Sequence, residues 1–462
     1  MAFPVRKVHM TGIGGVGMSG VARMLLHEGV SVSGSDLVDG AVLDTLRGMG
    51  AYLSVSQAGE NIPPDTEMLI ISAAVRQDNP EVVEARRRGM EIIKYASALG
   101  LLMREKTGVA VSGTHGKTTT TAMLAVILTS AGMDPSFVVG ATVPQLATSS
   151  REGAGDAFVV EACEYDRSFL NLHPQIAVIN NIEEDHLDYY GGLEEIVEAF
   201  REFAGLLDRD GVLVGNAHDR NAMSVLSAAR CRRLTFGAEV EADWQAVNLD
   251  CSDGAYCFDV MKDALMVGRM RLAIPGLHNV LNSLAAVAVA DELGVDFVAS
   301  ARALEDFCGA ERRFSIVGKA AGVTVIDDYA HHPTEIQVTL KAARDCYDSG
   351  RIWVVFQPHQ YSRTRFFLKD FARSFAQVDR IIVPDIYFVR DSDRERKLVN
   401  ARDLVTQMRG LGYHAEYIPE WRCIIDRIIS QARPGDVVIT MGAGNVNEVA
   451  DALFERLERE AD

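Results

Sequence analysis

The first glycine-rich segment of the chain, residues 12–17, has the spacing G-x-G-x-x-G and directly follows a short apolar run, Lys7–Thr11. This spacing is typical of a strand-to-helix loop whose backbone N–H groups approach a diphosphate. Asp36 follows about 20 residues later, where a ribose-binding carboxylate is expected. These residues predict a nucleotide diphosphate site, with NAD as one candidate ligand and a purely structural glycine turn as the alternative.

A second glycine-rich segment, residues 113–118, has the sequence GTHGKT. The full Walker A pattern requires a glycine five residues before Gly116, and Val111 stands there, so the segment is a shortened P-loop. Its backbone amides would surround phosphates at the start of a helix. Lys117 would reach the β and γ phosphates, and the Thr118 hydroxyl would bind Mg²⁺.

The two loops restrict the function more strongly together than separately. A dehydrogenase would use the first loop and leave the second without a role, and a simple P-loop ATPase or GTPase would do the reverse. The chain also lacks the Asn-Lys-x-Asp signature of guanine binding. A ligase that uses ATP to activate a nucleotide-linked substrate explains both loops.

Acidic residues follow two of the expected strands. Glu161 ends the run Ala157–Glu161, at the strand end where α/β proteins gather their sites, and there it would hold a magnesium ion or simply face solvent. Residues 181–188 (NIEEDHLD) combine acids with a histidine after the strand expected at Ile176–Asn180. This segment predicts either a second part of the same site or an acidic helix start.

Composition excludes several classes of protein. The chain has 462 residues and a net charge of −18, and without a long basic tract it is not expected to bind nucleic acid. No apolar run approaches the roughly 20 residues of a membrane span, and the first residues do not resemble a secretory signal. Seven cysteines without a Cys-x-x-Cys pair predict reduced thiols in a cytoplasmic protein. The sequence leaves open whether the protein is a monomer or a homodimer.

Short β-branched runs alternate with helical patterns along the chain, which predicts an α/β protein with mostly parallel sheets. We expect three domains: a Rossmann-like N-terminal domain (residues 1–106), a central P-loop domain (107–312) and a Rossmann-like C-terminal domain (313–462). Residues 244–272 predict an antiparallel addition to the central sheet. Further strands are expected at 30–33, 68–72, 91–95, 109–112, 323–327, 352–356, 380–384 and 436–441, and helices at 118–129 and 278–293.

Seven segments in a fixed order identify a family resemblance: GIGGVGMSG, SGTHGKTTTT, EACEYDRSFL, NNIEEDHLDYY, HNVLNSLAA, DDYAHHPTEI and FQPHQYSRT. Together they resemble the Mur ligases, and most closely the alanine-adding branch. The resemblance implies an ATP-dependent enzyme of peptidoglycan precursor synthesis that joins L-alanine to the carboxylate of UDP-N-acetylmuramate through an acyl phosphate. ADP and phosphate would be released, and the three domains would bind the UDP-sugar, ATP and the amino acid in that order.

The resemblance also implies a role for individual residues. The UDP-substrate would contact Gly12, Gly14, Gly15, Gly17, Met18, Ser19, Asp36, Ser72 and His115. ATP would contact Gly113, Thr114, His115, Gly116, Lys117, Thr118, Thr119, His278, Asn279, Asn282, Arg313 and Asp328. Mg²⁺ would be held by Thr118, Glu161 and His186, and the amino acid by Tyr329, His331, His359 and Arg363. The catalytic residues would be Lys117, His331, Arg363 and Arg313.

One departure and three alternatives accompany this prediction. Several Mur ligases hold a second metal with a carbamylated lysine, but no lysine occurs here between Lys117 and Lys262, so that arrangement is excluded in this segment. The nearest alternative is the recycling ligase that adds a ready-made tripeptide to the same UDP-sugar acid. An NAD-dependent oxidoreductase and a nucleotide-sensing regulator without catalysis are the other two.

Overall fold

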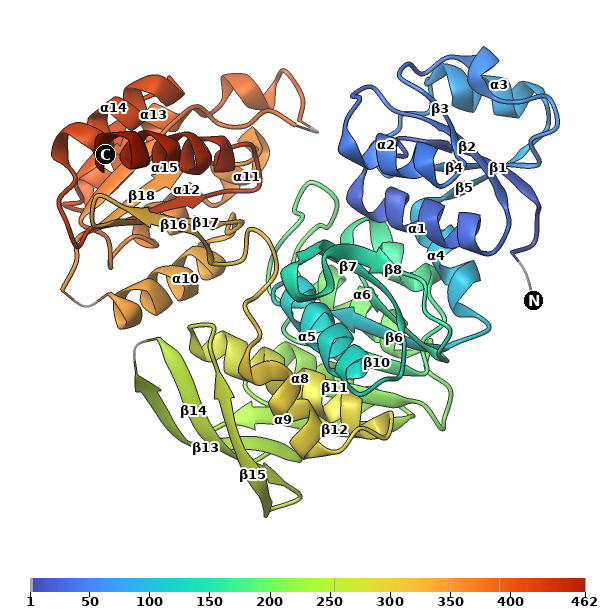
Figure 1. The fold of residues 1–462 in the computed structure, drawn as a ribbon, viewed down its shortest axis with the longest axis horizontal. Helices are drawn as coiled ribbons and strands as arrows, with labels where there is room; N and C mark the ends of the chain where they lie inside the picture. The colour runs from blue at the N-terminus through green and yellow to red at the C-terminus, as the bar shows by residue number, and fades with distance from the viewer. Residues whose placement is uncertain (1–2, 253, 348, 390, 462) are drawn as a thin grey trace.

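The computed structural model describes residues 3–252, 254–347, 349–389 and 391–461. Within these residues the strands form three sheets, of five, ten and six strands. Figure 1 shows one domain around each sheet, with the N-terminal domain in blue and the C-terminal domain in orange and red on the same side of the middle domain. The predicted three-domain α/β fold is confirmed.

The N-terminal sheet has the order β3-β2-β1-β4-β5, and all its neighbouring strands are parallel. Its order reverses at β1, so the loops after β1, β2 and β4 meet at one edge, where α/β sheets bind ligands. The strands are β1 (Lys7–Thr11), β2 (Ser31–Ser35), β3 (Tyr52–Ser54), β4 (Met68–Ile71) and β5 (Glu91–Lys94). The helices are α1 (Val16–His27), α2 (Ala41–Gly48), η1 (Gly59–Asn61), α3 (Pro80–Arg87) and α4 (Tyr95–Met103).

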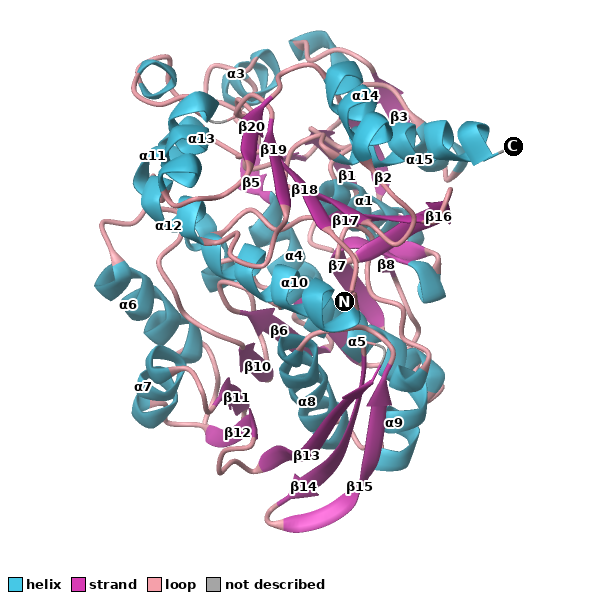
Figure 2. Cartoon of the chain, turned by 90° about the vertical axis from the view of Figure 1, so that its left-hand side faces the viewer, coloured by secondary structure: helices cyan, strands magenta, loops and turns pink. Residues whose placement is uncertain are grey.

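The middle sheet has the order β15-β14-β13-β12-β11-β10-β6-β9-β7-β8. Its strands are β6 (Thr107–Ser112), β7 (Ser136–Val143), β8 (Thr148–Arg151), β9 (Ala157–Glu161), β10 (Ile176–Ile179), β11 (Val212–Asn216), β12 (Arg232–Ala238), β13 (Trp244–Ser252), β14 (Ala255–Lys262) and β15 (Leu265–Leu272). The pairs β13–β14 and β14–β15 are antiparallel, which confirms the predicted addition. Figure 2 shows these three strands projecting from the lower end of the domain.

The helices of the middle domain are α5 (Lys117–Ser130), η2 (Pro144–Leu146), η3 (Tyr165–Asn171), α6 (Leu193–Ala204), α7 (Arg220–Ala228), α8 (Leu277–Glu292) and α9 (Phe297–Glu305). Helix α5 is buried from Thr118 to Leu128, because small and apolar side chains cover its whole circumference. It packs against α8, which is also apolar on most sides. The loop that precedes α5 is therefore attached at its C-terminal end to a central, buried helix.

The C-terminal sheet has the order β16-β17-β21-β18-β19-β20, and only its edge strand β16 is antiparallel to its neighbour. The strands are β16 (Ser315–Ala320), β17 (Val323–Asp328), β18 (Ile352–Phe356), β19 (Arg380–Val383), β20 (Ala415–Tyr417) and β21 (Val437–Met441). The helices are α10 (Pro333–Cys346), α11 (Tyr361–Phe366), α12 (Leu368–Arg373), η4 (Glu395–Lys397), α13 (Ala401–Gly410), α14 (Trp421–Gln431) and α15 (Asn447–Ala461).

The two outer domains contact the middle domain in different ways. Helix α1 packs against β7 and β8, and Arg23 Nη1 donates a 3.1 Å hydrogen bond to Thr148 Oγ1. The C-terminal domain reaches the middle domain through polar side chains near the start of α10. Among the helices in the described part of the chain, none is long and apolar enough to span a membrane.

Candidate active site

The loop of residues 113–116 joins β6 to α5 and is fixed by the segment that follows β10. Gly116 caps α5 in the left-handed conformation, with φ of 81°. The amide of Thr114 donates to the carbonyl of Asn181 at 3.0 Å, and the amide of His115 donates to Asn181 Oδ1 at 2.7 Å. The loop is therefore held in shape by a neighbouring strand end.

Lys117 lies inside this loop and pairs with a buried carboxylate. Its Nζ donates to the carbonyls of Gly113 and Thr114 and to Glu164 Oε2, the last two at 3.0 Å. Burial alone would lower the pKa of Lys117, but the neighbouring negative groups, of which Glu164 contributes most, together outweigh it and raise the pKa. Lys117 therefore carries its positive charge at neutral pH. Glu164 was not predicted as a site residue, although its place three residues after Glu161 was a signal.

Two of the three predicted magnesium ligands lie beside this lysine. Thr118 Oγ1 donates to Glu161 Oε2 at 3.2 Å, and burial raises the pKa of Glu161. The third, His186, lies with its Nε2 3.7 Å from Glu164 Oε1. A hydroxyl and a half-buried carboxylate side by side are oxygen donors of the kind that Mg²⁺ prefers, so the donor set fits this ion.

A cavity of about 150 Å³ opens next to the loop, between the middle and C-terminal domains. Nine residues predicted to contact ATP line it: His115, Gly116, Thr118, Thr119, His278, Asn279, Asn282, Arg313 and Asp328. Apolar walls complete it: Phe236, Ile274, Leu281, Phe314 and Val338. Burial lowers the pKa of His278 to about 4, so its imidazole is neutral. Apolar walls with a few neutral polar groups suit a flat heteroaromatic ring.

The first glycine loop borders a separate cavity of about 1030 Å³ in the N-terminal domain. Five of the residues predicted to contact the UDP-substrate line it: Gly12, Gly14, Gly15, Asp36 and Ser72. Gly14 N donates to Asp36 Oδ2 at 2.8 Å, which ties the loop to the end of β2. Gly17 lies against the ring of Tyr95, and the side chain of Met18 is buried in the core.

A third cavity, of about 430 Å³, is lined by residues of all three domains. Ser19 and Arg23 come from α1, Thr118 from the P-loop, and Arg313 and Tyr329 from the C-terminal domain. Arg313 Nη2 lies 3.5 Å from Thr118 Oγ1. This cavity adjoins Lys117's loop and is the place where groups from the three domains converge.

The remaining predicted residues of the C-terminal domain lie around the same junction. Arg363 Nη2 donates to Asp185 Oδ1 at 2.6 Å, and both side chains are buried. The Tyr329 ring lies 5.0 Å from the Arg313 guanidinium. His331 Nδ1 lies 3.0 Å from the Tyr329 carbonyl, and its ring is 6.0 Å from that of His359.

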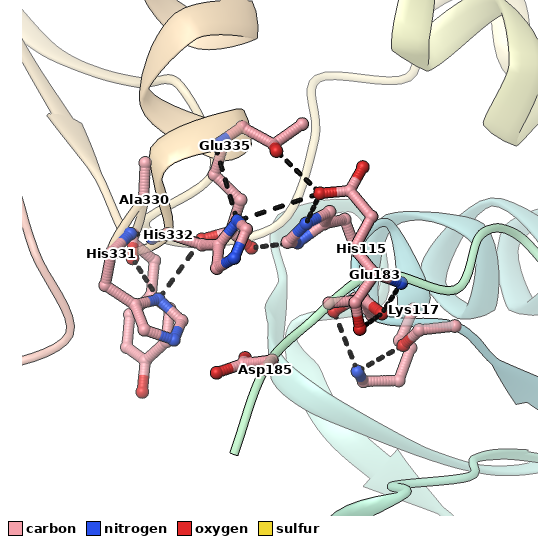
Figure 3. Close-up of polar contacts among 12 residues, drawn as sticks. His115, Lys117, Glu183, Asp185, Ala330, His331, His332 and Glu335 are labelled. Atoms are coloured by element: carbon pink, nitrogen blue, oxygen red, sulfur yellow. Dashed lines mark hydrogen bonds and ion pairs between the residues drawn. The ribbon is translucent and has the colours of Figure 1, made fainter. Parts of the chain in front are cut away.

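His115 connects the P-loop to the C-terminal domain (Figure 3). Its Nε2 lies 3.4 Å from Glu183 Oε2, and its Nδ1 lies 3.2 Å from Glu335 Oε1. Burial alone would lower the pKa of His115, but these two carboxylates raise it to about 9. Burial alone would favour the neutral form of Glu183, but hydrogen bonding to His115 lowers its pKa to about 2. Glu183 and Glu335 were not predicted, although both stand in segments quoted for the family resemblance.

Comparison with known proteins identifies the family. Models of three Mur ligase domains match in order: the catalytic domain over residues 7–107, the middle domain over 111–290 and the glutamate ligase domain over 312–444. The chain is also 43% identical to the UDP-N-acetylmuramate–L-alanine ligase of Solibacter usitatus, over 100% of this chain and 97% of that protein. The chain belongs to the Mur ligase family.

Solved structures of related ligases superpose on this Mur ligase over nearly its whole length. The UDP-N-acetylmuramate–alanine ligase of Thermotoga maritima superposes with a TM-score of 0.82 at 30% identity, covering 98% of this chain and 99% of that one. A murein peptide ligase from Psychrobacter arcticus shares the fold, with a TM-score of 0.73 at 24% identity and coverage of 98% and 99%. The family resemblance read from the sequence is therefore confirmed.

Proposed function

We propose that this Mur ligase joins L-alanine to the carboxylate of UDP-N-acetylmuramate, with ATP converted to ADP and phosphate. The observation that carries the proposal is the cavity of about 430 Å³ to which α1, the P-loop and the C-terminal domain all contribute. A nucleotide-sugar acid, a phosphoryl donor and an amine can meet only where all three domains reach. The full-length likeness to ligases of that name supports the choice of substrates.

The N-terminal cavity would hold the UDP part of the substrate. The glycine loop borders a space of about 1030 Å³ whose described lining includes Arg76 and no lysine, and backbone amides at a helix start suit binding of a diphosphate without chemistry on it. Asp36 and Ser72 would contact the ribose and the loop side of the nucleotide. The sugar acid would then extend along α1, past Ser19, toward the P-loop.

The P-loop would hold the phosphates of ATP, and His278, Asn279 and Asn282 would contact the base and sugar. Lys117 would exchange its bond with Glu164 for the β and γ phosphate oxygens. Mg²⁺ held by Thr118 and Glu161, with His186 close by, would supply charge neutralisation of those phosphates. Arg313 lies within reach of the same oxygens, because its Nη2 is 3.5 Å from Thr118 Oγ1.

The reaction would proceed in two steps. A muramate carboxylate oxygen attacks the γ phosphorus, which forms an acyl phosphate and releases ADP. The alanine amine then attacks the acyl carbon, the C–O bond to phosphate breaks, and the amine loses a proton. Lys117 and Arg313 would stabilise the phosphate charge in both steps, mainly by positioning and electrostatics.

The C-terminal residues would hold the amino acid. Arg363 would bind its carboxylate, and Tyr329 and His359 would border it. His331 is the proposed base: Glu335 Oε2 lies 3.2 Å from its Nδ1, so this nitrogen is held as the donor and Nε2 is left to accept a proton. The domain limits at residues 106 and 312 and a cytoplasmic location belong to the same proposal.

The test is ADP release from purified protein with ATP, Mg²⁺ and UDP-N-acetylmuramate. We expect release with L-alanine and none with buffer or with the L-alanyl-γ-D-glutamyl-meso-diaminopimelate tripeptide. Release with the tripeptide alone would contradict the alanine assignment in favour of the recycling reaction. The absence of ADP release with both, from folded protein that binds ATP, would contradict ligase activity on this sugar acid.

A further inference from the structure

Three side chains between the middle and C-terminal domains offer ligand atoms to one point (Figure 3). They are His115 from the P-loop, Glu183 from the segment after β10, and His332 at the start of α10. Glu183 Oε2 lies 3.4 Å from a ring nitrogen of His115, Nε2, and 4.0 Å from one of His332, Nδ1. All three ligand atoms lie within 4.8 Å of one another.

These separations are close to those of a small tetrahedral site. Zn²⁺ binds histidine nitrogen and carboxylate oxygen at about 2.1 Å, so two ligands of one tetrahedron are roughly 3.4 Å apart. Of the three pairs, His115–Glu183 already has this separation, and Glu183–His332 would need to shorten by a fraction of an ångström. The nitrogens of the two histidines lie within 4.8 Å of each other and would also need to approach. The side chains of His115 and His332 are only 13% and 6% exposed, so their positions are restricted by packing.

The other nitrogen of each histidine is held in the way that metal-binding histidines require. His115 Nδ1 lies 3.2 Å from the carboxylate of Glu335, and His332 Nε2 lies 3.0 Å from the carbonyl of Glu184. Such acceptors keep the proton on the outer nitrogen and direct the lone pair of the other nitrogen toward the metal. Here these nitrogens are the two that face Glu183. On His115 the cation would take the place of the proton shared with Glu183, so its binding would release one proton.

We propose that His115, Glu183 and His332 form a binding site for a borderline-soft divalent cation such as Zn²⁺, distinct from the Mg²⁺ ligands beside Lys117. Two imidazoles and one carboxylate favour a transition metal over Mg²⁺, which prefers oxygen ligands. A bound cation would replace the weak 3.3 Å hydrogen bond from the amide of Thr334 to His332 Nδ1. Thr334 Oγ1 could keep its 2.6 Å bond to Glu183.

The site would join two domains. His115 and Glu183 belong to the middle domain, and His332 belongs to the C-terminal domain. A cation bound to all three would therefore hold these domains together and slow their separation. Because His115 and Glu183 also line the nucleotide cavity, the occupied site would inhibit nucleotide exchange. This inhibition rests on the proposed ligase function, whereas the binding of the cation does not.

The test of binding is optical titration of the nucleotide-free protein with Co²⁺ in excess Mg²⁺. We expect one equivalent of Co²⁺ with the intense visible absorption of a tetrahedral site, and its displacement by Zn²⁺. Glu183→Gln keeps an acceptor for Thr334, and His332→Asn keeps a residue that can cap α10. Each variant should weaken binding by more than about 100-fold, because loss of even an outer-shell partner weakens metal sites 10- to 100-fold.

Glu161→Gln is the matched control, because it removes a carboxylate from the proposed Mg²⁺ site beside the same P-loop. The Co²⁺ spectrum should be unchanged in this variant. A spectrum that disappears in Glu161→Gln, or that survives in both Glu183→Gln and His332→Asn, would overturn the proposal. Thermal unfolding of each variant establishes that the protein titrated is folded.

The test of inhibition compares ADP release with and without Zn²⁺ at constant Mg²⁺, as a ratio within each variant. Zn²⁺ should lower the rate of ADP release at least tenfold in wild type and less than twofold in Glu183→Gln. If the wild-type spectrum forms but its rate does not change, the site exists and its regulatory role is wrong. If no ADP is released in any condition while the spectrum forms, the proposed ligase function fails and the metal site stands.

Discussion

The two glycine loops of this protein have the same strand–turn–helix backbone but different charged surroundings. In both, a buried parallel strand runs into a glycine turn and then into a helix, β1 into α1 and β6 into α5. The first loop faces a wide cavity, and the nearest charge on it is Asp36, which accepts from Gly14 N. The second loop encloses Lys117 and is flanked by Glu161 and Glu164.

Comparison of the two loops indicates that a glycine loop alone serves to bind phosphate. Chemistry on the phosphate needs charged side chains that other elements bring to the loop. Glu161 ends β9, Glu164 lies in the segment that follows it, and Arg313 comes from the start of the C-terminal domain. Changes in the first loop should therefore alter substrate affinity, and changes around the second should alter the rate of the chemical step.

The largest effect is expected from Lys117→Ala. Removal of a preorganised charge on the transferring phosphoryl group should lower kcat by about 10³-fold or more. The affinity for UDP-N-acetylmuramate, measured by calorimetry, should stay within twofold, because its nucleotide is proposed to bind at the other loop. Lys341→Ala, an exposed lysine on α10, is the control and should retain full activity. A Lys117→Ala enzyme with more than a tenth of the wild-type kcat would contradict the assigned role.

A pair of alanine substitutions compares the two loops directly. Gly116 has φ of 81°, and a Cβ there would lie 2.5 Å from Asn282 Oδ1, so Gly116→Ala should lower kcat roughly 100-fold by distorting the loop. A Cβ on Gly14 would lie 2.9 Å from the movable end of Asp36. Gly14→Ala should therefore raise KM for the UDP-substrate about tenfold without lowering kcat.

Gly48→Ala is the control for this pair, because a Cβ at Gly48 meets nothing within 4 Å. Steady-state kinetics with each substrate varied in turn provide the measurement. If Gly14→Ala lowers kcat as strongly as Gly116→Ala, the division of the loops into binding and chemistry is wrong.

The carboxylates at the two loops provide the next comparison. Glu161→Gln keeps the size of the side chain and removes the charge next to Thr118, so the Mg²⁺ concentration for half-maximal activity should rise roughly tenfold. Asp36→Asn should leave this concentration unchanged and raise KM for the UDP-substrate. Magnesium titrations of ADP release measure both. An equal shift in the two variants would indicate that the overall negative charge of the protein, and not a local site, sets the Mg²⁺ requirement.

The smallest effect concerns pH. The pKa of His115 is raised to about 9 because its protonated form pairs with Glu183 and Glu335, so this stabilisation is complete below the ordinary value of 6.5 and is lost as pH rises through 9. Glu183 belongs to the same domain as His115, so only the pairing with Glu335 depends on domain closure. This pairing should contribute on the order of 1 kcal/mol to the free energy of closure, or about fivefold in the ratio of closed to open forms.

Small-angle scattering between pH 6.5 and pH 9.5 should therefore show expansion in wild type. His115→Gln, which cannot be protonated, should give a curve that does not change with pH. Binding of UDP alone to the first loop should stay constant up to pH 8.5, because His115 lies in another domain. Expansion of equal size in His115→Gln would assign the pH dependence to other groups.

The sequence predicted most of the fold because the signals are local. β1, β9 and β18 have the predicted bounds, since each is a short apolar run that ends in a loop of glycine or polar residues. Strands β3, β7, β8, β11, β12, β16 and β20 were not predicted. Several of these lie at sheet edges or are exposed along one side, and there tertiary pairing decides the structure more than the residue pattern does.

The candidate site was predictable where chemistry and position coincide in one segment, as at Lys117, Thr118 and Glu161. Its ion pairs were not, because they join residues far apart in the sequence. Asp185 and Arg363 are separated by 178 residues, and His115 and Glu335 by 220. A single sequence carries no information on such pairs, and the roles assigned to individual residues remain predictions for the experiments above.

The packing of α1 on β7 and β8 fixes the distance between the first glycine loop and the P-loop. The cavity of the first glycine loop and the P-loop are joined by the packing of α1 on β7 and β8, to which Arg23 adds bonds to Thr148 and Ser150, so the distance between them is set by the protein. A substrate anchored by its diphosphate must therefore have the right span for its carboxylate to arrive beside Lys117. Nucleotide-sugar acids that are one or two bonds too short or too long would bind, but their carboxylates would stop away from the phosphate that they must attack.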